Sequence, residues 1–149
     1  MAEHRWSILC ARGVIDKYSN MLSLLEVTDE LTIQEILEPV PDNPALDVNL
    51  HLVSMWFRGQ SDQPEKFWCS CIITAPNGDT FETLSEPLEG NLETVPRTRL
   101  IFRIQSMPFR GAGTYYFDVV AAESPAGPFP VVARVPLEIK MSVGAAATP

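Results

Sequence analysis

Apolar and polar residues alternate through several short runs of this chain, and this spacing limits its fold more than any other feature of the sequence. Side chains two positions apart lie on the same face of a β-strand, so alternation is typical of strands that bury one face. The clearest runs are Leu46–Leu52, Phe67–Ile73, Leu100–Ile104, Thr114–Val120 and Val131–Ile139. Many of the 13 prolines fall between apolar runs, as expected of turns between strands rather than of long helices.

Turn signals connect these runs to further expected strands. Asn77-Gly78 predicts a tight hairpin turn with positive φ angles, so a return strand from Thr80 to about Glu86 is expected after it. Near the start of the chain, strands at Arg5–Ala11 and Met21–Thr28 are expected on either side of a turn at residues 16–20.

Two places leave alternatives open. Thr28–Leu37 is compatible with a strand, because its apolar residues alternate, or with a short helix, because Thr32 and Glu35 have capping-box spacing. Its β-branched residues favour the strand. Pro136 cannot donate a ladder hydrogen bond, so the last strand is expected to lie at a sheet edge or to carry a bulge.

About eight short strands separated by turns predict an all-β fold, an antiparallel β-sandwich. Antiparallel pairing is expected because parallel neighbours need long crossover connections. A chain of 149 residues fits one domain, which we assign to residues 1–143. The small-residue tail at 144–149 is expected to be disordered.

Charge and cysteine content narrow the classes of partner. The net charge of −8 argues against nucleic acid, because nucleic-acid-binding surfaces need cations that displace counterions. No apolar run approaches membrane-spanning length, so no membrane partner is expected. The three cysteines are odd in number and lack the spacing of a disulfide framework. Together these features predict a cytoplasmic protein.

A short motif near the C-terminus carries one resemblance. Gly113-Thr-Tyr115-Tyr-Phe117 resembles the start of a late strand in immunoglobulin-like sandwiches, in which the tyrosine fixes a strand corner. The resemblance implies that role for Tyr115. Phe117 stands where antibody domains have a paired cysteine, so the inter-sheet disulfide of those domains is not implied.

The N-terminal segment carries a second resemblance. Ile8-Leu-Cys10, then Asp16, then the run from Asn20 to Val27 are similar to the opening of a bacterial family of small uncharacterised all-β proteins, a domain of unknown function. Members of that family also end in a Gly-x-Tyr strand. The resemblance implies a bacterial, cytosolic β-sandwich of the immunoglobulin-like kind, and it implies no activity.

Side chains capable of catalysis or metal binding are few. Cys69 and Cys71 would leave one face of a strand with Cα atoms roughly 6.5 Å apart and parallel Cβ vectors, a poor geometry for a mutual disulfide. A zinc ion would need further ligands from Cys10, His4 or His51, and the spacing matches no zinc signature. No nucleophile elbow accompanies the two histidines. We therefore expect no catalytic, cofactor-binding or metal-binding residues.

Two surfaces are candidates for an interface. Arg99, Ile101 and Arg103 share a face, so the arginines form a basic stripe that either contacts an acidic partner or keeps the sheet face hydrated. Trp68 and Tyr116, if both face outward, would create an exposed aromatic patch.

These observations favour a noncatalytic protein-interaction module that binds a protein partner or itself, as a homo-oligomer, through a sheet face or edge. Two alternatives remain open from the sequence. One is an enzyme or small-ligand binder with a site formed by the sandwich loops, and the other is a structural subunit of a larger assembly.

Overall fold

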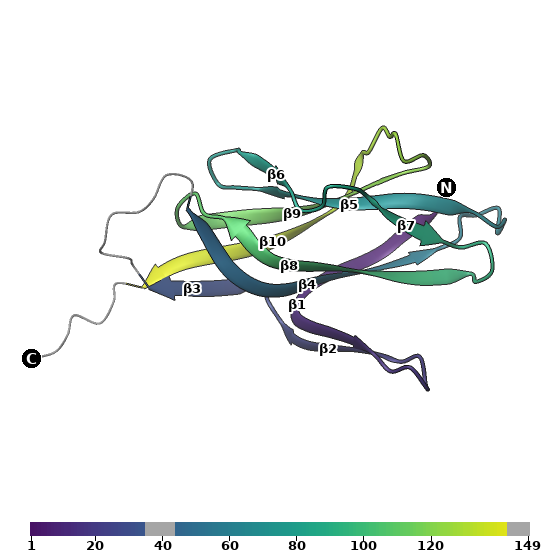
Figure 1. The fold of residues 1–149 in the computed structure, drawn as a ribbon, viewed down its shortest axis with the longest axis horizontal. Helices are drawn as coiled ribbons and strands as arrows, with labels where there is room; N and C mark the ends of the chain where they lie inside the picture. Colours follow the sequence, from purple (N-terminus) through teal and green to yellow (C-terminus); the bar gives the residue numbers. More distant parts are fainter. Residues whose placement is uncertain (35–43, 143–149) are drawn as a thin grey trace, which may run out of the picture.

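The structure, a computed structural model, describes residues 1–34 and 44–142. These residues form ten strands in two sheets that pack face to face, with no helix among them (Figure 1). Sheet A has four strands in the order β2 (Leu22–Val27), β1 (Glu3–Ile15), β4 (Ala45–Phe57) and β8 (Arg97–Pro108). Sheet B runs in the order β3 (Glu30–Gln34), β10 (Val131–Ser142), β9 (Gly113–Ala122), β5 (Lys66–Thr74) and β6 (Thr80–Glu82), and β7 (Leu88–Asn91) also pairs with β5. The predicted all-β sandwich is therefore confirmed.

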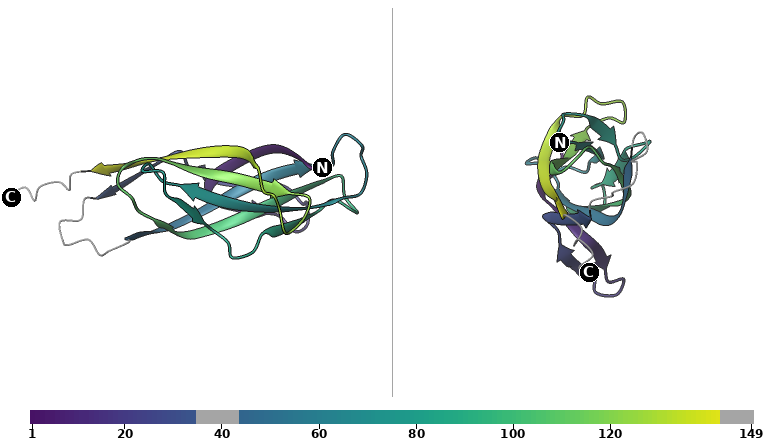
Figure 2. Two further views of the ribbon diagram at one scale, coloured as in Figure 1. Left: turned by 90° about the horizontal axis from the view of Figure 1, so that it is seen from above. Right: turned by 90° about the vertical axis from the view of Figure 1, so that its left-hand side faces the viewer.

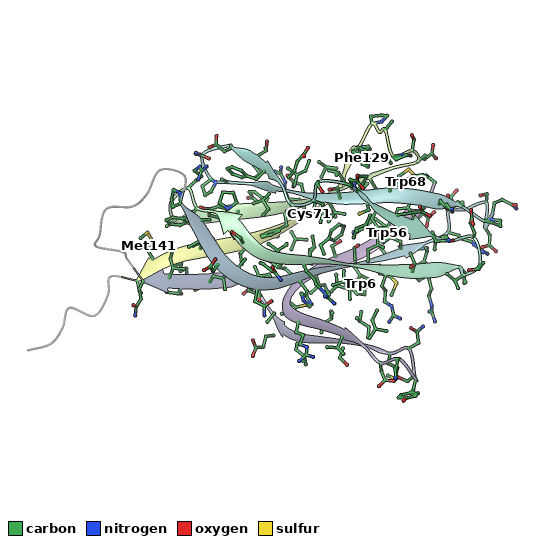
Figure 3. All side chains as sticks on the ribbon, viewed as in Figure 1. Trp6, Trp56, Trp68, Cys71, Phe129 and Met141 are labelled. Atoms are coloured by element: carbon green, nitrogen blue, oxygen red, sulfur yellow. The ribbon has the colours of Figure 1, made fainter. Side chains whose placement is uncertain are left out.

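The core lies between the two sheets, and the alternation seen in the sequence fills it. In β5 the residues Phe67, Cys69 and Cys71 are fully buried, while their neighbours Trp68 and Ser70 on the other face are half-buried. Trp56 of β4 is also fully buried, and its ring lies 4.6 Å from that of Phe67 across the interior. Figure 3 shows Trp56 and Cys71 between the sheets and Trp68 on the outer side of sheet B.

The corner predicted for Tyr115 is present. Its buried hydroxyl donates a hydrogen bond to the carbonyl of Gly111 at 2.7 Å and accepts one from the backbone N–H of Arg110 at 2.7 Å. The phenol thus fixes the turn that precedes β9, which is the role that the resemblance implies.

Most expected strands form, with two differences on the hairpin side of sheet B. The return strand ends at Glu82 rather than near Glu86, and a separate strand, β7, follows after Pro87. β7 has only four residues and no readable alternation, so it was not expected. It lies close to β5 because Gly90 leaves room for the Phe67 ring, which a Cβ at that position would meet at 2.1 Å.

The turn at Asn77-Gly78 forms, but with a different backbone from the one expected. Gly78 alone adopts a positive φ, of 92°. Asn77 instead uses its side-chain oxygen to accept a hydrogen bond from the N–H of Asp79 at 3.0 Å. This Asx-type bond stabilises the turn without the left-handed conformation at Asn77.

The last strand meets the expectation drawn from Pro136 only in part. β10 is not an end strand, because it lies between β9 and β3. Its pairing with β3 is parallel, an exception to the predicted antiparallel arrangement, and covers only Glu138–Ser142. At Pro136, however, the described residues pair β10 with β9 only, so the other side of β10 is locally unpaired there. An irregularity of register occurs in this strand, but between Val131 and Ala133.

The segment Thr28–Leu37 contains a strand, β3, as favoured above, over the part of it that is described; its residues 35–37 and the tail at 144–149 lie outside the described residues. No helix able to cross a membrane is found in residues 1–34 and 44–142.

Candidate functional site

A two-stranded ribbon stands away from the sandwich on the side of sheet A (Figures 1 and 2). β1 pairs with β4 from Glu3 only as far as Cys10, which lies opposite His51. Beyond that point β1 continues to Ile15 paired with β2 alone. We call this ribbon, residues 11–27, the arm.

The base of the arm packs on the outer face of sheet A. The N–H of Gly13 donates a hydrogen bond to Nδ1 of His51 at 2.9 Å. Val53 points to the outer face of the sheet and is nevertheless fully buried, because Gly13 covers it. A Cβ at position 13 would lie 2.8 Å from Cγ2 of Val53, so only glycine permits this approach.

The tip of the arm is tied to β8. Asp16 accepts hydrogen bonds from the N–H groups of Tyr18 and Ser19, which lower the pKa of its carboxyl and fix the turn. Asn20 follows with a positive φ of 57°. The guanidinium of Arg99 donates to both the carbonyl and the side-chain oxygen of Asn20, at 3.0 and 2.8 Å. The arm is therefore held at both ends, by Gly13 and by Asn20.

A groove runs between the arm and sheet A. It consists of three adjoining hollows, of about 390, 470 and 380 Å³. Ile15 lines both the first and the second hollow, and Asn20, Val95 and Arg97 line both the second and the third. Its basic lining residues are Arg12, His51, Arg97, Arg99 and Arg103. Met55 and Ile101 give it an apolar floor. Among the described residues, no Asp or Glu lines it.

Two of the residues singled out in the sequence, Arg99 and Arg103, lie in this groove. Their register partners on β4 are Met55 and His51, and Ile101 between them lies opposite Val53. The alternation correctly placed Arg99, Ile101 and Arg103 on one face. His51, which occupies a polar position in the alternating run Leu46–Leu52, is half-buried beside the arm and accepts the Gly13 hydrogen bond.

The other two residues, Trp68 and Tyr116, do not form one aromatic patch. Both lie on the outer face of sheet B, but Trp68 is opposite Ala122 whereas Tyr116 is opposite Thr74, at the far end of the same strand pair. Six residues of β-strand separate these positions by about 20 Å. Both side chains are half-buried.

The Tyr116 ring is covered rather than free. The Arg134 guanidinium lies 4.6 Å from the centre of that ring. The same guanidinium donates two hydrogen bonds to the buried carboxylate of Asp118, at 2.7 and 3.2 Å, and the Thr74 hydroxyl donates a third at 2.9 Å. This network explains the position of Tyr116 as part of the packing of sheet B.

The cysteines are packed in the interior. Cys10, Cys69 and Cys71 are free thiols and all are buried. Burial raises the pKa of Cys69 well above its usual range and raises the pKa of Cys71 to about 12, so both stay protonated at neutral pH. In the described part of the chain no group of three or more His, Cys, Asp and Glu side chains is placed to hold a metal ion.

The arm and the contribution of Arg12 to the groove were not predicted from the sequence. The signals were present in part, since the turn at 16–20 and the strands on either side were expected. The alternation of apolar and polar residues does not mark the point at which β1 leaves β4. Gly13 is the one local sign in β1 that another element approaches the backbone closely.

Comparisons of the chain with protein-family models, with curated proteins and with solved structures found no match.

Proposed function

We propose that this chain is a noncatalytic protein-interaction module and that the arm is its binding element. The proposal rests on the distribution of exposed apolar side chains over the surface. Ten large apolar side chains are exposed in the described residues, and half of them lie on the arm: Ile15, Tyr18, Met21, Leu25 and Val27.

Two features make these side chains unlike scattered surface residues. They are gathered on one short ribbon, and clustered exposed apolar groups mark interaction sites more often than single ones do. A two-stranded ribbon is also marginally stable in water by itself. The arm's own pairing therefore contributes little to stability, and its exposed apolar side chains favour a role in binding over a role in the core.

The cytoplasm is the compartment we propose, supported by the free state of all three cysteines. The partner is a protein or a second copy of this chain. An enzyme or small-ligand binder and a structural subunit of a larger assembly would each give a different result in the experiment that tests this proposal.

The test compares three tagged proteins expressed at native level in the organism that carries the gene. The first is the unmodified chain. The second carries Leu25→Ser and Val27→Ser on the arm. The third, a matched control, carries Val131→Ser and Val132→Ser, which removes two exposed valines on β10 of sheet B, outside the arm.

We expect the unmodified chain and the control to retain one stoichiometric partner, or to self-associate in sedimentation, and the arm variant to lose it. Retention by the arm variant, or equal loss from the control, would refute the role of the arm. A bare monomer in every case would refute the interaction module and favour a small-ligand binder, and a large symmetric particle would favour the structural subunit.

A further inference from the structure

The cations of this protein fall into two sets. The chain has 11 lysines and arginines. Six of them lie within 4.0 Å of a carboxylate oxygen: Arg5, Arg58, Lys66, Arg110, Arg134 and Lys140. Among residues 1–34 and 44–142, the other five have no carboxylate within that distance: Arg12, Lys17, Arg97, Arg99 and Arg103. All five lie on the arm or on β8.

This separation is unexpected from composition alone. The chain has 19 acidic residues, so carboxylates outnumber cations. Even so, four arginines surround the groove between the arm and sheet A, and no Asp or Glu of residues 1–34 and 44–142 lines it. Cations gathered in a concave site with apolar walls focus a positive potential there and raise the local concentration of anions.

We propose that the groove binds an extended acidic segment of a partner protein, with carboxylates of the segment paired to Arg12, Arg99 and Arg103. The inference rests on the proposed function, because it names the chemistry of the partner. Apolar side chains of the segment lie on Ile101 and Met55, which separate the cations along the floor. Arginine suits this role because its planar guanidinium can bind a carboxylate with two hydrogen bonds.

The spacing of the cations favours an extended segment. Arg99, Ile101 and Arg103 occupy alternate positions on the outer face of β8. Side chains on one face of an extended segment repeat at the same spacing, so its carboxylates can meet the two arginines while an apolar side chain between them meets Ile101.

Two other occupants fit less well. A second copy of β8 paired antiparallel about Ile101 would place Arg99 of each copy opposite Arg103 of the other, and like charges directly opposite destabilise a strand pair. Nucleic acid is charged at every phosphate, including those beyond the groove, where it would meet the repulsion of a protein with a net charge of −8. A short acidic segment whose few carboxylates lie within the groove meets less of this repulsion.

The experiment measures binding of a short fluorescent peptide that repeats Glu-Thr-Val-Thr, so that glutamate and valine alternate along one face of the extended peptide, by polarisation at low and high salt. The same peptide with glutamine in place of glutamate, and a single-stranded oligonucleotide, are the competing probes. One variant carries Arg99→Gln and Arg103→Gln. A second carries Arg12→Gln and Arg103→Gln, which leaves the bond between Arg99 and Asn20 intact. The control carries Lys66→Gln and Lys140→Gln, an equal loss of charge on sheet B.

We expect each groove variant to weaken binding of the glutamate peptide roughly tenfold or more, equivalent to about 1.4 kcal/mol, and the control to weaken it far less. High salt should weaken binding by the unmodified chain. Equal binding of the glutamine peptide, equal effects of groove variants and control, or no binding would each overturn the inference. Tighter, groove-dependent binding of the oligonucleotide would overturn it in favour of a general polyanion site. If the acidic peptide fails while the arm variant still loses its partner, the proposed function stands and only the charge inference fails.

Discussion

Replacing Gly13 by alanine tests whether the arm is truly packed on sheet A. The new Cβ would lie 2.8 Å from Cγ2 of Val53, whereas two carbons at optimal separation are about 3.5–4.0 Å apart. Val53 is fully buried and β-branched, so it has little freedom to turn aside. Either the valine or the arm must shift.

The expected cost follows from two opposing effects. Overpacking of this kind costs about 1–3 kcal/mol. Alanine also restricts the unfolded chain, which stabilises the protein by about 0.4–1 kcal/mol. The clash is the larger effect, and displacement of the arm would also stretch the 2.9 Å bond from the Gly13 N–H to His51. We expect Gly13→Ala to lower the free energy of unfolding by about 1–2 kcal/mol in total.

The assay is urea unfolding of four proteins: unmodified, Gly13→Ala, Val53→Ala and the double variant. Val53→Ala alone should cost about 1.5 kcal/mol for the two carbons removed. In the double variant the clashing carbon is absent, so its loss should be smaller than the sum of the single losses by roughly 1 kcal/mol. Hydrogen exchange at the residue-13 amide should be faster in Gly13→Ala and slow again in the double variant.

Additive losses in the four proteins would refute the packing of the arm described above. So would a Gly13→Ala protein that is more stable than the unmodified chain, because that is the result expected of a glycine in open space.

Three further perturbations have expected outcomes. Tyr115→Phe should lower the free energy of unfolding by about 1–3 kcal/mol, measured by urea titration, because the Gly111 carbonyl and a neighbouring N–H lose their buried partner; an unchanged midpoint would refute the corner. Burial lowers the pKa of His4 below its usual value of 6.5. As the pH drops below about 6.5, His4 is protonated in the unfolded chain before it is protonated in the folded one, so the free energy of unfolding should fall. His4→Gln should flatten this part of the curve of unfolding free energy against pH. Burial raises the pKa of the Cys69 and Cys71 thiols, so a thiol reagent at neutral pH should modify them only at the rate of unfolding, and rapid labelling of the native protein would contradict that burial.

Much of the fold follows from the sequence because a strand repeats with a period of two. That period is enough to place Phe67, Cys69 and Cys71 in the core and to put Arg99 and Arg103 on one face. The period shows which face of a strand a side chain lies on, but it does not show which strands pair with each other or in what register.

The features that were not predicted from the sequence all depend on which strands pair and in what register. Trp68 and Tyr116 both lie on the outer face of sheet B, as the alternation permits. The register between β5 and β9, however, places them at opposite ends of that strand pair. The parallel pairing of β3 with β10 joins segments near the two ends of the chain, and no local pattern marks it. Likewise, nothing in the alternation of β1 shows that its partner changes after Cys10, which is the change that creates the arm and the groove.

The place of β10 in sheet B also has a consequence for biosynthesis. β10 is the last strand of the described chain to leave the ribosome, yet it lies in the interior of its sheet, where it joins β9 to β3. Glu30 pairs with Glu138, so β3 must wait for almost the whole chain before it has a partner. Sheet A has no such dependence, since β1, β2, β4 and β8 are complete once Pro108 has been added. Contacts so distant in sequence slow folding and leave strand edges uncovered in the meantime. The nascent chain therefore carries a finished sheet A opposite an unfinished sheet B, and stalled synthesis before Val131 would leave the inner face of sheet A and the edge of β9 open to aggregation.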